Sequence, residues 1–104
     1  MIPKPLRLFM SRLLQATNDS EISWEEGADQ AYFAVQKNAN IHIRYSVDHD
    51  TGESGYVFRI VRGEGDAFFS VTNDEDDYAF MRNLFSAVSV NAAGGTAIVD
   101  NLFD

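Results

Sequence analysis

The side chains best suited to chemistry stand in one short stretch near the middle of the chain. Asp48, His49, Asp50 and Glu53 lie within six consecutive positions, and the whole chain has two histidines. Carboxylates and imidazoles are ligands for divalent metal ions, and they also transfer protons in catalysis. This stretch is therefore the first candidate for a metal site or a catalytic site.

The spacing of these residues does not fit a calcium loop. An EF-hand needs oxygen ligands at its first, third and fifth positions, glycine at the sixth and glutamate at the twelfth. Counting from Asp48, the fifth position is Gly52, the sixth is Glu53 and the twelfth is Arg59. The pattern therefore excludes an EF-hand.

A zinc site is also disfavoured. The second histidine, His42, precedes His49 by seven residues, which is roughly 20 Å along an extended strand. By contrast, Asp50, Gly52 and Gly55 suit a hairpin loop, because aspartate bonds to the nearby backbone and glycine accepts a positive φ. We predict a connecting loop here, with no bound metal and no cofactor.

No other motif points to catalysis. The chain has no cysteine, no G-x-S-x-G element around a serine and no phosphate-binding loop with its lysine. The carboxylate pairs Glu25-Glu26 and Asp76-Asp77 are typical of a solvated surface. We therefore expect a protein that is not an enzyme.

The two segments that flank the loop have the pattern of strands. Residues 40–47 (NIHIRYSV) and 56–62 (YVFRIVR) alternate between two kinds of side chain, as strands with one buried face do. In the first segment Ile41 and Ile43 point to one side, whereas His42 points to the other. The two segments predict one antiparallel hairpin.

Three other segments complete the predicted sheet. Ile22 and Trp24 alternate with polar residues, which predicts a strand from Glu21 and a core position for Trp24, with an interface role as the alternative. Residues 31–37 fit either a strand or a helical turn, and we prefer the strand. Residues 67–71 predict the last strand.

Helical patterns stand near both ends of the chain. Apolar residues at helical spacing predict an amphipathic helix from Lys4 to Ala16, and a second helix that carries Tyr78, Met81 and Leu84 on one face. A capping box, Thr72-x-x-Glu75, predicts the start of the second helix. Two glycines at 94–95 predict its end. Residues 96–103 (TAIVDNLF) predict a last helical turn or two packed on the body.

This order of elements predicts the fold class α+β. We expect one globular domain over residues 1–104, with an N-terminal amphipathic helix, an antiparallel meander sheet of four to five strands, and one or two C-terminal helices packed on one face. Small bacterial and phage accessory proteins share this layout.

Charge and composition limit the partners. Sixteen acidic and eight basic residues give a formal net charge of -8. This charge repels the phosphate backbone, so direct nucleic-acid binding is not expected. The lack of cysteine is compatible with a reducing compartment, and no segment has the ~20 apolar residues of a membrane span. We expect a cytoplasmic protein that does not contact a membrane.

The second face of the predicted sheet carries the most informative surface. It combines cationic and apolar side chains: His42, Arg44, Val57, Arg59, Val61 and Phe68. A fully solvated face would carry fewer valines and aromatic residues. We predict that another chain covers this face, either a partner protein or a second copy in a homodimer. The alternative is an ordinary exposed face with scattered apolar residues.

A second contact surface is predicted at the acidic cluster Asp74, Glu75, Asp76 and Asp77. Clustered carboxylates speed the encounter with a partner that has a basic surface, and they make binding sensitive to salt. The favoured function is therefore non-enzymatic binding of another protein. Such a protein would be an accessory factor, an inhibitor or immunity protein, a secretion-type chaperone or a phage-encoded antagonist.

Two other functions stay open. The first is a small-molecule-binding or catalytic domain with a pocket between the sheet and the helices, in which His42, Arg44 or Arg59 would supply polar contacts. The second is a nucleic-acid mimic, in which spaced carboxylates would occupy a nucleic-acid-binding cleft.

Overall fold

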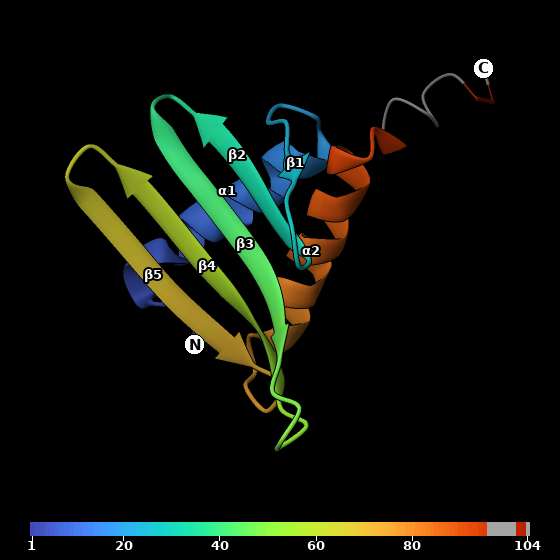
Figure 1. Ribbon diagram of the computed structural model, residues 1–104. Helices are drawn as coiled ribbons and strands as arrows, with labels where there is room; N and C mark the ends of the chain where they lie inside the picture. Colours follow the sequence, from blue (N-terminus) through green and yellow to red (C-terminus); the bar gives the residue numbers. More distant parts are fainter. Residues whose placement is uncertain (96–101, 104) are drawn as a thin grey trace.

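The computed structural model of the chain describes residues 1–95 and 102–103, and its central part is a five-stranded antiparallel sheet (Figure 1). The sheet is a meander in which each strand pairs with the next in sequence. Its strands are β1 (Glu25–Glu26), β2 (Ala31–Gln36), β3 (Ala39–Val47), β4 (Ser54–Arg62) and β5 (Gly65–Thr72). This arrangement confirms the predicted α+β class and the strand at residues 31–36.

The hairpin of β3 and β4 is the longest paired unit of the sheet. Its register runs from Ala39 opposite Arg62 to Val47 opposite Ser54, so both strands pair along all nine of their residues. Within it Ile43 faces Phe58. The alternation of side chains in both arms fixes this register, because a slip of one residue would turn every apolar side chain to the wrong face.

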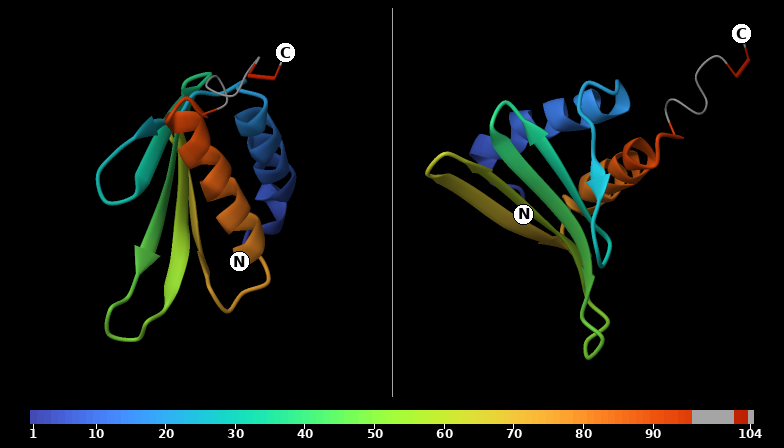
Figure 2. Two further views of the ribbon diagram at one scale, coloured as in Figure 1. Left: turned by 90° about the vertical axis from the view of Figure 1, so that its right-hand side faces the viewer. Right: turned by 45° about the horizontal axis from the view of Figure 1, so that its top comes forward.

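Two helices cover one face of the sheet. A 3-10 turn, η1 (Lys4–Leu6), leads into α1 (Arg7–Asn18), and α2 (Tyr78–Ala92) follows the last strand. Both helices lie on the same side of the sheet, as the view along the sheet in Figure 2 shows. No described element covers the opposite side.

The core fills the space between this face and the helices. Its centre consists of side chains with no exposed surface: Met10, Ile43, Phe58, Val71, Met81, Leu84 and Val88. These residues come from α1, α2 and three strands, which is the packing that two amphipathic layers require. Burying them supplies most of the free energy that favours folding.

Trp24 belongs to this core and not to the surface. Its side chain is 4% exposed, and its indole Nε1 donates a hydrogen bond to the hydroxyl of buried Thr17 at 3.1 Å. The side-chain amide of Asn91 accepts from the backbone N–H of Trp24 and donates to the carbonyl of Ile22. These bonds satisfy the polar groups of the segment that leads into the sheet.

The strand predicted from Glu21 is shorter than its alternation indicates. Ile22 and Trp24 are both buried, as predicted, but only Glu25 and Glu26 pair with β2. The polar groups of Ile22 and Trp24 bond to Asn91 on α2, so this segment follows the helix layer instead of extending the sheet.

Both helices begin later than predicted. Lys4–Leu6 form the 3-10 turn with Pro5 in it, and α1 extends past Ala16 to Asn18. The capping box closes a turn before α2: Glu75 accepts from the backbone N–H of Thr72 at 2.7 Å. The helix itself begins at Tyr78, so the prediction that Thr72 caps it was wrong.

The helix α2 ends where the two glycines at 94–95 predict. The helix ends at Ala92, and Gly94 has φ +73°, the left-handed conformation that commonly closes a helix. Most of the predicted last turn falls on residues 96–101, which lie outside the described residues. Leu102 and Phe103 are described, and they are exposed instead of packed on the body. None of the helices in the described parts of the chain is long and apolar enough to cross a membrane.

Candidate functional site

The sheet face that points away from the helices is the candidate site, and we call it the open face. One row of side chains crosses it, because the strand register places Phe33 opposite His42, His42 opposite Arg59, and Arg59 opposite Phe68. Alternation places the neighbours of these residues, such as Phe58 and Phe69, in the core. The row therefore joins β2, β3, β4 and β5, which lie side by side in the sheet (Figure 1).

Large apolar side chains on the open face remain exposed. Phe33 is 46% exposed, Val35 is 68% exposed and Phe68 is 67% exposed. A depression of about 360 Å³ lies among Phe33, Val35, His42 and Val61. Apolar side chains grouped in this way around a depression are a feature of binding surfaces, whereas single exposed ones are ordinary.

Arg59 is held in place by an ion pair with Asp66. Its Nε donates to Oδ1 at 3.0 Å and its Nη2 donates to Oδ2 at 2.6 Å, which is a bidentate pair across β4 and β5. The hydrogen bonds raise the pKa of Arg59 and lower the pKa of Asp66. The pair fixes the guanidinium between the depression and Phe68, where a bound partner would meet a positioned donor.

His42 has an unusual environment at the centre of the row. Its ring lies against Phe33, with the centroids 4.7 Å apart. Burial lowers the pKa of His42 below its ordinary value, and the charges of Arg44 and Arg59 lower it further. The imidazole is therefore kept neutral to a lower pH than an exposed one, so its ring serves as part of the apolar surface.

The structure brings all six residues of the predicted sheet surface onto the open face. His42 and Arg44 come from β3, Val57, Arg59 and Val61 from β4, and Phe68 from β5. The core residues of these strands have the opposite parity in sequence. The six residues therefore lie together on one surface.

Sequence reasoning missed the two β2 residues of this surface, Phe33 and Val35. The alternation of side chains along residues 31–36 could have identified them. It puts Tyr32 and Ala34 on one face of the strand, and Phe33 and Val35 on the other. It was ambiguous, since both faces of this strand carry apolar side chains.

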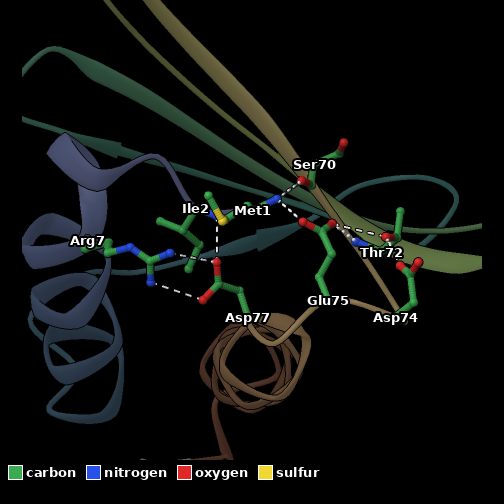
Figure 3. Close-up of polar contacts among 8 residues, drawn as sticks. All are labelled: Met1, Ile2, Arg7, Ser70, Thr72, Asp74, Glu75 and Asp77. Carbon is green, nitrogen blue, oxygen red and sulfur yellow. Dashed lines mark hydrogen bonds and ion pairs between the residues drawn. The ribbon is translucent and has the colours of Figure 1, made fainter.

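The acidic cluster holds the N-terminal segment instead of forming one free acidic surface (Figure 3). The carboxylate of Asp77 accepts from the backbone N–H of Ile2 at 2.8 Å and from both terminal nitrogens of Arg7. Glu75 forms an ion pair with the α-amino group of Met1. These bonds lower the pKa of Glu75 and of Asp77.

Only part of the predicted acidic contact surface is therefore available to a partner. Asp74 and Asp76 are exposed, whereas Glu75 and Asp77 are half-buried in contacts within the chain. The hydroxyl of Thr72 also donates to Asp74. The cluster thus ties the start of the chain to the connection between β5 and α2.

The stretch around His49 is the predicted connecting loop. The carboxylate of Asp48 accepts from the backbone N–H of Asp50 at 2.9 Å, and Gly52 has φ +74°. These are the local bond and the positive φ that a tight loop between β3 and β4 requires. Among residues 1–95 and 102–103, no group of three or more histidine or acidic side chains is placed to hold a metal ion.

A second hollow, of about 240 Å³, lies beside this loop. Hydroxyl-bearing residues and two carboxylates contribute to its lining: Ser46, Asp48, Thr51, Glu53, Ser54, Ser70 and Thr72. These short polar side chains are well solvated in an open hollow and gain little from a partner. The depression beside Phe33 is larger and more apolar, so it is the better candidate.

The pocket expected between the sheet and the helices is not supported by the positions of its residues. His42, Arg44 and Arg59, which would have supplied its polar contacts, lie on the open face. Behind them the space is filled by core side chains such as Phe58 and Met81, which have no exposed surface. A ligand that used these three residues would bind on the outside of the sheet.

Comparisons of this chain with protein-family models, with curated proteins and with solved structures found no match.

Proposed function

We propose that this protein is a non-enzymatic binding protein that acts by docking another protein on its open face. The observation that carries the proposal is the row Phe33–His42–Arg59–Phe68, which crosses a sheet face that no described element covers. Aromatic residues and arginine are the residue types that contribute most to protein interfaces. Here the two exposed phenylalanines stand on either side of a positioned arginine.

The energy of such docking would come from the apolar side chains of the open face. Phe33, Val35 and Phe68 are between 46% and 68% exposed, and a partner would remove this area from water. Full burial of a side chain of this size is worth about 1.5–3 kcal/mol, and because these three are already partly buried, each would contribute roughly half to two thirds of that before the costs of association. The depression beside Phe33 would accept an apolar side chain of the partner.

Charge sets the chemistry of the partner. Arg44 forms no ion pair within the described residues, and it lies on the open face beside the fixed Arg59. A partner would meet these guanidinium groups with carboxylates or backbone carbonyls. Elsewhere the chain is acidic, with a net charge of -8, so basic groups at the edge of the partner would speed the encounter. Binding would therefore weaken at high salt.

The proposal is tested by affinity capture with matched variants from cells of the native host. Phe33→Ser and Phe68→Ser each remove an exposed aromatic ring from the open face, so both should lose the captured protein and keep the thermal unfolding midpoint. Leu8→Ser is the matched control, because Leu8 is 66% exposed on α1, on the other side of the molecule. Capture that is equal for all three variants would overturn the proposal.

A small carboxylic acid with an apolar body is a second candidate occupant. The depression of about 360 Å³ has the volume of a small-molecule site, and Arg59 and His42 supply polar contacts at its border. A thermal shift with a library of small carboxylic acids distinguishes this function from protein binding. A shift that disappears in both Arg59→Ala and His42→Ala, with no captured protein, would favour the ligand.

A further inference from the structure

The last residues of the sequence have a pattern that complements the open face. Residues 96–104 are TAIVDNLFD, with two apolar pairs, at 98–99 and 102–103. Each pair is followed at once by an aspartate, Asp100 or Asp104. The open face offers the complementary groups, which are exposed apolar side chains, the guanidinium of Arg44, and the guanidinium of Arg59 in its ion pair with Asp66. One segment could therefore satisfy both the apolar and the cationic parts of the surface.

The described part of this segment, Leu102 and Phe103, stands away from the rest of the described chain. Leu102 is 62% exposed and Phe103 is 96% exposed. Side chains of this size gain free energy when another surface removes them from water. Each copy of the chain carries both this segment and the open face, so a second copy can supply the segment.

The spacing of the segment matches the spacing of the open face. Along an extended chain, two positions four residues apart are separated by about 13 Å. Phe33 on β2 and Phe68 on β5 are three strands apart, which is about 14 Å at the usual strand separation. If the segment binds in an extended form instead of the helical turn that its apolar spacing predicts, alternate side chains share one side, so Ile98 and Leu102 would reach Phe33 and Phe68 together. Asp100 stands between these two residues on the same side and would then face the middle of the row, beside Arg44.

We propose that the open face binds residues 98–104 of a second copy of this chain. This proposal rests on the open face being the binding surface, and it names the partner. Two copies can exchange these segments reciprocally, which closes the assembly as a symmetric dimer. Self-association should weaken with salt, because the arginines and aspartates form its polar contacts.

The first experiment measures the mass of the full-length protein by sedimentation velocity from micromolar to millimolar concentration. The wild-type mass should rise to twice that of the monomer. The double variant Leu102→Asp, Phe103→Asp should stay monomeric over the same range, whereas Leu8→Asp, which removes an equally exposed leucine from α1, should still dimerise. A wild-type protein that stays monomeric, or a double variant that dimerises like the wild type, would overturn the proposal.

Reversal of charge tests the polar contacts separately. Arg44→Glu should weaken self-association about tenfold or more, which corresponds to the loss of one charge-assisted contact. Adding Asp100→Lys and Asp104→Lys to the same chain should restore it. No recovery in the combined variant, with the fold intact by circular dichroism, counts against the proposal.

A synthetic peptide, TAIVDNLFD, shows where the segment binds. It is titrated into the isotope-labelled double variant, whose open face is unoccupied if the proposal holds. The amide NMR signals of Phe33, His42 and Val61 should shift, and those of α1 should not. Shifts confined to the helices, or no shifts at all, would overturn the proposal. If it fails while Phe33→Ser still abolishes capture of a host protein, the proposed function stands and only the named partner is wrong.

Discussion

The ring of Phe33 lies against the imidazole of His42, with the centroids 4.7 Å apart and the planes inclined by 31°. The two residues are cross-strand partners on β2 and β3, so the contact follows directly from the register of the sheet. Through this contact, the imidazole of His42 forms one aromatic surface with the ring of Phe33. The protonation of His42 should therefore report on the packing of this surface.

The pKa of His42 should be measurably below its ordinary value of 6.5, because burial disfavours the charged ring and Arg44 and Arg59 repel it. Phe33→Ala should raise this pKa by exposing the ring to water. The measurement is an NMR titration of the imidazole signals, assigned with the variant His49→Asn. A pKa of His42 that is the same in Phe33→Ala and in the wild type would contradict this account.

The same shift predicts the sign of a pH dependence of stability. The folded-state pKa of His42 is lower than that of the unfolded chain, so the unfolded chain binds the proton more readily. The free energy of unfolding should therefore be highest above about pH 6.5 and fall as the pH drops through the folded-state pKa. Urea unfolding at several pH values should show this fall in the wild type, and His42→Gln should reduce it.

Phe68 and Phe69 are neighbours in sequence that lie on opposite faces of β5. Phe69 is 6% exposed and Phe68 is 67% exposed. Phe69→Ala should lower the free energy of unfolding by about 3–5 kcal/mol, because it leaves a cavity in the core. Phe68→Ala should change it by about 0.5 kcal/mol or less. Chemical denaturation of both variants measures the difference, and equal losses would show that the open face is not open in solution.

Asp77 should stabilise the fold through the N-terminal segment. Hydrogen bonds from Arg7 and from the backbone N–H of Ile2 lower the pKa of Asp77 below its ordinary value of 3.8. Its contribution is therefore present above about pH 4 and lost as the pH falls through the folded-state pKa. Asp77→Asn should lower the free energy of unfolding at neutral pH by about 1–3 kcal/mol.

The matched control for this prediction is the neighbouring carboxylate. Asp76 is exposed, so Asp76→Asn should change the free energy of unfolding by about 0.5 kcal/mol or less. Comparison of the two variants in urea at neutral pH separates a specific contact from a general change of charge. If both lose the same stability, the contacts of Asp77 with Arg7 and Ile2 contribute nothing beyond charge.

The hairpin could be predicted from the sequence because two independent signals agree there. Alternation in residues 40–47 and 56–62 defines which face is buried, and Gly52 permits the positive φ that the loop adopts. Together they place His42 and Arg59 opposite each other on the open face. Local sequence patterns are enough to predict a contact when it joins two strands that are neighbours in sequence.

The N-terminal contacts could not be predicted from the sequence. The pattern Thr72-x-x-Glu75 has the residues of a capping box, and a turn uses the same hydrogen bond, so the start of α2 was placed too early. The contact of Asp77 with Ile2 joins residues 75 positions apart. No local periodicity indicates such a contact, because it exists only after the sheet and the helices have packed.

Tyr56 provides a test of the core at alkaline pH. The pKa of Tyr56 is raised to about 12 from an ordinary value of 10.0. The larger cause is burial of the side chain, and the second is the nearby Tyr78. The unfolded chain therefore loses this proton first, so the stability is complete below about pH 10 and declines as the pH rises towards about 12. Tyr56→Phe should reduce this decline, measured by urea unfolding across the alkaline range. Tyr45→Phe is the control. It removes a hydroxyl from the same aromatic cluster, in which the ring centroids of Tyr45 and Tyr56 are 5.3 Å apart, and it should leave the alkaline decline in place. An alkaline profile that is unchanged in Tyr56→Phe would mean that this buried hydroxyl does not limit the stability of the fold.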